Sequence, residues 1–233
     1  MTTLILTPTQ LELHLLEPLV SPSVNGTDAL FELCGFGPVA SAARAMQLIA
    51  RHQPTRVILV GIAGSLRSEL AVGTARSFRQ VTCVGVGAGT GMNHQSADEI
   101  GWKHWVSAGL TVAEPQAGIG DVLPLAPSLT DAMELGGELL TVCAASANDQ
   151  DVAMRLARHP AASAEDMEGF GVAVACYFGG IPLEIIRGIS NRAGDRNKSN
   201  WDIEGALHAA GSLTLKVLSA YTNGILSNNE DRW

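Results

Sequence analysis

Runs of apolar residues recur along the chain, and each run is bounded by polar, glycine or proline residues. Short continuous runs rich in Val, Ile and Leu are typical of strands buried on both faces of a sheet. The strongest of these predicted strands are Thr3–Thr7, Arg56–Gly61, Leu139–Ala145 and Leu183–Ile189. Weaker strand patterns occupy Val24–Cys34, where Asn25-Gly26 suggests a hairpin, and also Ala75–Val86 and Gly118–Leu125.

The segments between these runs carry apolar residues at the spacing of an amphipathic helix. We predict helices at Pro38–Gln53, Asn148–Ala157 and Glu204–Leu226, and another that begins after the Pro8-Thr9 turn. Strands and helices that alternate along a whole chain are typical of an α/β protein. The predicted fold is a three-layer sandwich, in which helices flank a central mixed β-sheet, built as a single domain over residues 1–233.

The stretch from Ala164 to Asn200 carries most of the chemical information. Asp166 and Glu168 precede the small and apolar run Gly169–Phe178, and acidic residues at that place favour the start of a helix. The strand that follows ends at Ser190-Asn191. The helix runs antiparallel to the strand that follows it. The polar start of the helix and the polar end of the strand therefore lie on the same side of the sheet. Ligands of open α/β sheets bind at such strand ends.

Composition excludes several classes of function. A chain of 233 residues with 46% hydrophobic content can bury a large core. The net charge of -8 argues against a nucleic-acid partner, since that affinity comes from clustered Lys and Arg. Four cysteines lack C-x-x-C spacing and six histidines lack H-x-x-x-H spacing. We therefore expect thiols in a reducing compartment, no metal site and no cofactor.

The apolar run at the amino terminus is short. No basic segment precedes Leu4–Leu6 and Pro8 soon interrupts it, so an ordinary secretory signal is not expected. No stretch approaches the roughly 20 apolar residues that span a bilayer. We expect a cytoplasmic protein that does not contact a membrane.

One long motif is specific. The run DMEGFGVAVACYFGGIPLEIIRGISN resembles the signature of the purine nucleoside phosphorylase and nucleosidase superfamily, in which a Met-Glu pair opens a helix and a strand ends in Arg-x-x-Ser-Asp or Ser-Asn. Within that superfamily, the ending RGISNRAGDRN is most similar to the futalosine hydrolases. The resemblance implies a nucleoside phosphorylase-like fold and an enzyme that hydrolyses an N-glycosidic bond and releases hypoxanthine, in menaquinone biosynthesis. The expected partner is a small-molecule nucleoside.

The resemblance also assigns roles to individual residues. Glu12, in the first turn of its helix, matches the carboxylate that activates the attacking water, although a carboxylate there also complements the helix dipole. Glu168 would accept hydrogen bonds from the ribose hydroxyls, and its charge favours the positive charge that grows on the sugar. The other residues expected at the site are Ala63, Gly64, Met167, Ser190 and Asn191.

Asn191 stands where adenine-specific nucleosidases have Asp. An amide cannot protonate the purine atom N7, but its NH2 group can hydrogen-bond to N7 and to a 6-oxo group. An amide rotated the other way also pairs with adenine, so this chemistry alone does not choose the base. A methylthioadenosine/S-adenosylhomocysteine nucleosidase is therefore an alternative.

Two further alternatives differ in what they require. Phosphorylases of this superfamily carry a Gly-Asp-Pro-x-Arg loop after the first strand, whereas this chain has Thr7-Pro8-Thr9-Gln10-Leu11, which favours water as the nucleophile. A nucleoside-binding module without catalysis would keep Glu168 and Asn191 but would not need Glu12.

Two segments have less specific interpretations. Gly85–Gly91 lacks the G-x-G-x-x-G spacing of a dinucleotide site, so we interpret it as a loop, with a place near the substrate as a hypothesis. Trp102 and Trp105 suggest a covered sheet edge or a pocket mouth, and on this basis we expect a homo-oligomer.

Overall fold

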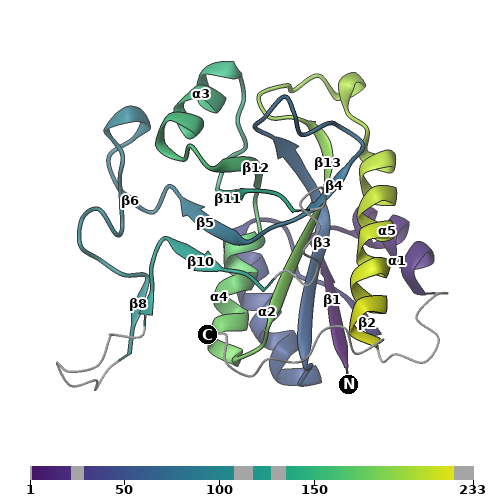
Figure 1. Cartoon of the computed structure of the whole chain (residues 1–233). Coiled ribbons are helices and arrows are strands. Elements are labelled where there is room, and N and C mark those ends of the chain that lie inside the picture. The colour runs from purple at the N-terminus through teal and green to yellow at the C-terminus, as the bar shows by residue number, and fades with distance from the viewer. Residues whose placement is uncertain (1, 22–28, 108–117, 127–134, 223–233) are drawn as a thin grey trace.

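The computed structural model describes residues 2–21, 29–107, 118–126 and 135–222. A mixed sheet of nine strands forms the middle layer (Figure 1). Its strands are β1 (Thr3–Thr7), β2 (Ala29–Leu33), β3 (Arg56–Ser65), β4 (Ala75–Ser77), β5 (Gln80–Val84), β10 (Val122–Pro124), β11 (Glu138–Val142), β12 (Ala162–Asp166) and β13 (Leu183–Arg192). Two small two-stranded sheets lie outside it, formed by β6 (Gly87–Ala88) with β7 (Gln95–Ser96) and by β8 (Trp105–Val106) with β9 (Gly118–Ile119).

Helices cover both faces of the sheet. The helix α2 (Pro38–His52) packs against α4 (Gly169–Gly179) on one face, and α1 (Gln10–Val20) packs against α5 (Ile203–Thr222) on the other (Figure 1). A shorter helix, α3 (Asp149–Arg158), lies near the end of the sheet at which β12 is seen. The predicted three-layer α/β sandwich is therefore confirmed.

The central strands β1 and β3 contain continuous apolar runs because both of their faces are buried. In β1, Leu4 and Leu6 enter the core under α2 and α4, while Ile5 enters the core under α1 and α5. The same alternation occurs in β3, where Val57 and Ile58 take opposite faces. Successive side chains of a strand point to opposite faces, which explains why the strand signal was a continuous apolar run.

The strand β3 organises the sheet. It pairs in parallel with β1 through its first residues and with β13 along its length. Its last residues also pair antiparallel with β12. The strand predicted at Arg56–Gly61 is too short: β3 continues to Ser65 because β12 and β13 both offer backbone partners there.

Other boundaries differ slightly from the prediction. The strand expected at Leu139–Ala145 ends at Val142, and β12 was not predicted at all. The segment Gly85–Gly91 contains β6 rather than only loop. Asn25-Gly26 and the last residues of the helix expected to reach Leu226 lie outside the described residues. No helix in the described ranges is long and apolar enough to cross a membrane.

Candidate active site

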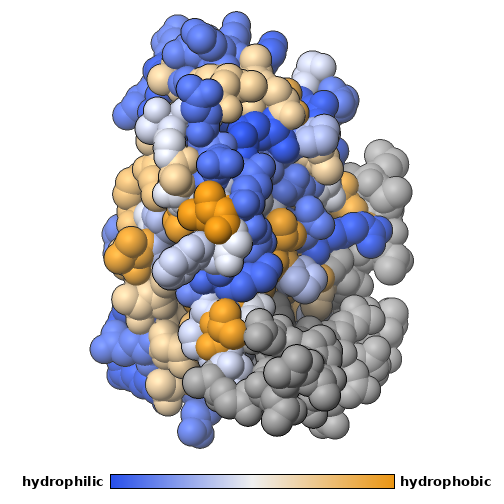
Figure 2. Space-filling model, turned by 90° about the vertical axis from the view of Figure 1, so that its left-hand side faces the viewer, coloured by the Kyte–Doolittle hydropathy of each residue, from blue (hydrophilic) through white to orange (hydrophobic). Residues whose placement is uncertain are grey.

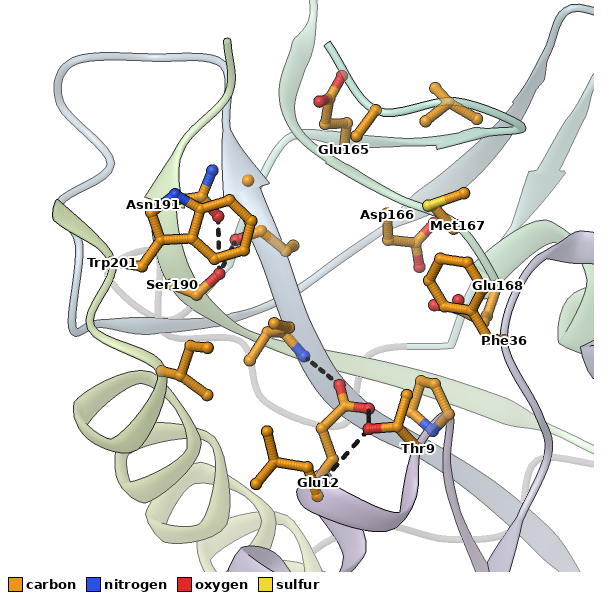
Figure 3. A pocket seen from close by; sticks show the side chains of 18 of the residues that line it. Thr9, Glu12, Phe36, Glu165, Asp166, Met167, Glu168, Ser190, Asn191 and Trp201 are labelled. Atoms are coloured by element: carbon orange, nitrogen blue, oxygen red, sulfur yellow. Dashed lines mark hydrogen bonds between the residues drawn. The ribbon is translucent and has the colours of Figure 1, made fainter. Parts of the chain in front are cut away.

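A cavity of about 320 Å³ opens beside the carboxyl-terminal half of β3. Its walls come from α1, β3, β12, β13 and the segments just before α2 and α5 (Figure 3). All seven residues that the sequence suggested for the site line this cavity: Glu12, Ala63, Gly64, Met167, Glu168, Ser190 and Asn191. None of the residues of Gly85–Gly91 lines it.

Glu12 is buried and held by two hydrogen bonds. Thr9, the N-cap of α1, donates its hydroxyl to Oε2 of Glu12 at 2.5 Å, as Figure 3 shows. The backbone N–H of Ile62 in β3 donates to Oε1 at 3.0 Å. Thr and Glu at this spacing form a capping box when the Glu turns back to the N-cap backbone N–H. Here the carboxylate turns to β3 instead, and this contact fixes it at the cavity wall.

A buried arginine joins the two polar ends of the Ala164 to Asn200 stretch. Arg187 of β13 is fully buried, and its Nε and Nη2 lie 3.1 and 2.6 Å from Oδ2 of Asp166. Its Nη2 is also 3.4 Å from Oε2 of Glu168. Asp166 accepts in addition from the N–H of Gly169 at the start of α4. This network confirms that the start of the helix and the end of the strand meet.

The absence of a side chain at Gly61 permits this arrangement. A Cβ at Gly61 would collide with Nη1 of Arg187 and would lie 2.7 Å from Oε1 of Glu12. The guanidinium and this carboxylate therefore lie over the same point of β3. Nη1 of Arg187 is buried without a hydrogen-bond partner among the described residues. The positive charge of Arg187 therefore lies beside Glu12.

Glu168 lies at the start of α4 with 4% of its surface exposed. Burial raises the pKa of its carboxyl to about 7, an effect that Arg187 partly offsets and Asp166 reinforces. Its Oε1 accepts from the N–H of Gly37 at 3.0 Å. Glu168 is therefore close to the midpoint of its titration at neutral pH.

The orientation of the Asn191 amide is determined by its neighbours. Ser190 Oγ donates to Oδ1 of Asn191 at 2.8 Å, and Nδ2 donates to the carbonyl of Arg192 at 2.8 Å. A flipped amide would set its oxygen against that carbonyl, so Nδ2 must face Arg192. One N–H and one lone pair of the amide remain for a ligand.

Polar side chains lie at both ends of the cavity. Figure 3 shows Asn191 and Glu165 toward one end and Thr9 and Glu12 toward the other.

The remaining lining includes aromatic side chains that local patterns did not reveal: Phe36, which is exposed, and Trp201, whose ring lies under the guanidinium of Arg196 at 5.3 Å. Thr9 and Glu165 were also missed, although a Thr three residues before Glu12 is a recognisable cap signal. No group of three His, Cys, Asp or Glu suited to a metal ion occurs in the described part of the chain.

Comparison with known proteins identifies the wider group. A family model described as the Phosphorylase superfamily matches residues 9–81 and 137–223. A futalosine hydrolase from Thermus thermophilus is 26% identical over 227 residues, which cover 93% of this chain and 95% of that protein. A futalosine hydrolase from Streptomyces coelicolor is 32% identical over 157 residues, which cover 66% of this chain but only 60% of that protein.

A second group of relatives carries a different name. A 5'-methylthioadenosine/S-adenosylhomocysteine nucleosidase from Shewanella halifaxensis is 24% identical over 208 residues, which cover 81% of this chain and 85% of that protein. The crystal structure of a nucleosidase of the same name from Colwellia psychrerythraea, in complex with adenine, matches with a TM-score of 0.71 and 22% identity. The match covers 94% of this chain and 95% of that chain, and at this identity it establishes the fold.

Proposed function

Because the chain belongs to the phosphorylase superfamily, we propose that it is a nucleosidase that hydrolyses the N-glycosidic bond of futalosine. The products would be hypoxanthine and dehypoxanthine futalosine, and the reaction would serve the futalosine pathway of menaquinone biosynthesis. The main support is that one cavity contains Glu12, Glu168 and Asn191, one side chain for each part of the reaction. The futalosine hydrolases of Thermus and Streptomyces support the choice of substrate.

In this proposal Glu12 takes a proton from water. Oxygen atoms of its carboxylate are held by Thr9 and Ile62, so the group is oriented before substrate arrives. The positive charge of the buried Arg187 guanidinium lies beside Glu12 and favours the negative charge that the water oxygen gains as the proton leaves. The water oxygen then forms a bond to the anomeric carbon as the glycosidic bond breaks, and the electron pair of that bond goes to the base.

Glu168 and Asn191 act on the two halves of the substrate. As a carboxylate, Glu168 accepts from the ribose hydroxyls and favours positive charge on the sugar in the transition state. The free N–H of Asn191 donates to the purine atom N7 or to the 6-oxo group, and so stabilises the negative charge that the base receives. Met167 lies next to Glu168 on the same wall and packs on the ribose face.

Phosphorolysis is disfavoured by the turn between β1 and α1. Thr9 occupies that turn as the helix cap, and its hydroxyl is engaged by Glu12. No arginine is available in Thr7-Pro8-Thr9-Gln10-Leu11 to bind phosphate. Hydrolysis of methylthioadenosine is the second candidate, because relatives such as the Shewanella nucleosidase match most of the chain.

A substrate panel tests the function directly. The protein is incubated with futalosine, inosine or methylthioadenosine in phosphate-free buffer, and the released base is identified by chromatography. We expect futalosine to be cleaved fastest, to hypoxanthine, with no stimulation by phosphate. Asn191→Asp should lower the rate on futalosine and raise the relative rate on methylthioadenosine, because a protonated carboxyl donates to N7 while its other oxygen accepts from a 6-amino group.

Three outcomes of the panel would contradict parts of the proposal. Faster cleavage of methylthioadenosine than of futalosine by the wild-type protein would reject the substrate. A strict requirement for phosphate would reject hydrolysis. No release of base from any nucleoside would favour a binding module without catalysis.

The pH dependence of the reaction should report Glu168. Its raised pKa means that the carboxylate needed for the ribose forms only as pH rises through about 7. We expect kcat/KM to increase across that range, since kcat/KM follows groups of the free enzyme. This increase in kcat/KM should be absent in Glu168→Gln, because the glutamine side chain does not titrate. An unchanged increase in that variant would assign the pKa to another group.

Stability should change in the opposite direction over the same range. The folded protein holds the Glu168 proton more tightly than the unfolded chain, whose carboxyl titrates near 4.5. The protein should therefore lose stability as pH rises from about 4.5 to about 7. Urea denaturation of wild type and Glu168→Gln at the two ends of this range measures the difference.

We also propose a cytoplasmic homo-oligomer. Figure 2 shows separate apolar groups among polar ones on the side of the molecule that carries β8. Trp102 is 73% exposed, and Trp105 packs edge-on against Phe178, itself exposed, with ring centroids 5.1 Å apart. The rings of Trp105, Tyr177 and Phe178 pack against one another, and a contiguous exposed apolar group of this kind favours a protein interface. A monomer in sedimentation equilibrium would contradict this part of the proposal.

A further inference from the structure

Among the described residues, a single cation lines the cavity, and the proposed reaction gives it no role. Arg196 lies in the loop between β13 and α5, and it lines the cavity although its side chain is exposed. The other charged side chains of the described lining are all carboxylates: Glu12, Glu165, Asp166 and Glu168. We propose that Arg196 binds a carboxylate at the end of the substituent on the 5′ carbon of the substrate's ribose. This inference rests on the proposed function, because it takes the cavity to hold a ribonucleoside.

The carboxylates of the cavity are held by partners other than Arg196. Three of the four pair with two other arginines, Arg155 and Arg187. The fourth, Glu12, accepts from the hydroxyl of Thr9. An anionic ligand is repelled by these acids and is attracted only at Arg196. The charges therefore orient the substrate, with its neutral nucleoside end among the acids and its anionic end at Arg196.

The acid next to Arg196 in the chain is also engaged elsewhere. Oδ1 of Asp195 accepts from the backbone N–H of Asn197 at 2.9 Å, and Oδ2 accepts from Nδ2 of Asn200 at 2.8 Å. The hydrogen bond from Asn200 holds the pKa of the Asp195 carboxyl below its usual range. Asp195 thus closes its own loop, and within the described residues no salt bridge occupies the guanidinium of Arg196.

Trp201 fixes the position of this guanidinium. Its ring lies 5.3 Å from Cζ of Arg196, and its indole N–H donates to the carbonyl of Asp195 at 3.0 Å. The N–H of the next residue, Asp202, donates to the carbonyl of Ser190 in β13 at 2.8 Å. The ring is therefore tied both to the loop and to the sheet. A guanidinium held over a ring keeps its edge free, and that edge matches the two oxygens of a carboxylate.

The cavity wall on this side is otherwise apolar. Leu11, near the start of α1, and Ile203, the first residue of α5, line the cavity together with Trp201. The two helices pack against each other, so their first residues form one wall. These side chains offer no hydrogen bond to a sugar hydroxyl or a base, but they can bury an apolar arm.

The position of this wall assigns it to the 5′ substituent. In the proposed function, Glu168 takes the ribose hydroxyls and Asn191 takes the base, so the remaining branch of the sugar is its 5′ carbon. Figure 3 shows Trp201 across the cavity from Glu168 and Met167. An arm that leaves the sugar on that side passes over the apolar wall and ends at Arg196.

The test compares two nucleosides that differ at this carbon. The 5′ substituent of futalosine ends in a carboxyphenyl group, whereas inosine has only a hydroxyl there. Titration calorimetry uses Glu12→Gln protein, so that the nucleoside is not consumed. Adding Arg196→Gln should weaken binding of futalosine by about five- to fiftyfold, less than a buried charge pair because Arg196 is exposed. Binding of inosine should stay within about twofold. Equal effects on both nucleosides, or no effect on either, would overturn the inference.

A control variant makes the same change of charge in the same loop. Lys198 is exposed and does not line the cavity. Lys198→Gln should leave both affinities within about twofold. If it weakened futalosine as much as Arg196→Gln does, the general charge of the loop would be responsible and Arg196 would have no specific role.

A change in the ligand gives the same test without a variant at Arg196. The methyl ester of futalosine is neutral, so the protein should bind it about five- to fiftyfold more weakly than futalosine itself. Added salt should narrow this difference, because an exposed ion pair is screened. Equal binding of the ester and the acid would contradict the inference.

Failure of the proposed function would look different. If the wild type bound futalosine through Arg196 but released no base, hydrolysis would be rejected and this assignment would stand. If Glu12→Gln still turned over, the ratio of kcat/KM for futalosine and inosine would replace the two affinities as the readout, and Arg196→Gln should lower that ratio by the same factor.

Discussion

Glu12→Gln should lower kcat on futalosine by about 10²- to 10⁴-fold, the usual range for loss of a general base. The affinity for hypoxanthine should stay within about twofold of wild type, because Glu12 lies at the other end of the cavity from the proposed base site (Figure 3). Glutamine preserves the fold at this position. Its carbonyl can accept from Ile62 N–H while its NH2 group donates to the hydroxyl of Thr9, where the wild-type carboxylate accepts.

The matched control lies in the same helix. Glu17 of α1 is exposed, so Glu17→Gln makes the same chemical change away from the cavity. It should leave kcat unchanged within about twofold. Single-turnover rates and calorimetry with hypoxanthine separate chemistry from binding. A Glu12→Gln protein with nearly wild-type kcat would leave Glu12 only the role of complementing the helix dipole.

Arg187→Met should lower the free energy of unfolding at neutral pH by about 3–5 kcal/mol, the range for removal of one partner of a buried ion pair. The guanidinium is fully buried and faces Asp166 and Glu168, neither of which has another cation among its contacts in the described residues. Methionine fills much of the volume but leaves both carboxyl groups uncompensated. The loss of stability caused by Arg187→Met should become smaller as pH falls. Arg187 lowers the pKa of Glu168, so removal of Arg187 makes protonation of Glu168 easier.

Urea denaturation measures this effect against two controls. Arg192→Met removes an exposed arginine from the end of the same strand and should change stability by less than about 1 kcal/mol. Adding Asp166→Asn to Arg187→Met removes one of the uncompensated charges and should recover part of the loss. If Arg187→Met proved as stable as Arg192→Met, the buried network would not hold α4 and β13 together.

The stretch from Ala164 to Asn200 was predicted most successfully. The structure begins α4 at Gly169 and β13 at Leu183, where the acidic residues and the Gly and Pro residues suggested. These signals act between residues a few positions apart, because caps, dipoles and backbone restrictions are local. The meeting of the helix start with the end of the strand also followed, since a helix and the strand after it return to the same side of a sheet, but the ion pair between Asp166 and Arg187 was not predicted.

Strand β12 and the end of β3 were not predicted, and the reason is tertiary. Ala162–Asp166 has no long apolar run, and Gly61–Ser65 has the composition of a turn. Both segments are strands because β3 lies between β12 and β13 and receives backbone hydrogen bonds from each. Context of this kind outweighs intrinsic strand propensity.

Sequence by itself determined the α/β class, the helices, most of the buried strands, and the small set of polar residues at strand and helix ends. The resemblance carried by the sequence also named seven residues of the cavity, but only the tertiary structure decided how they are held and which other residues line the cavity with them. Glu12 turns from its own helix to Ile62, and Glu165 stands across Gly64 from Asn191. Local periodicity reports which face of an element is buried, whereas these contacts depend on which strands become neighbours and on where glycines leave space between them.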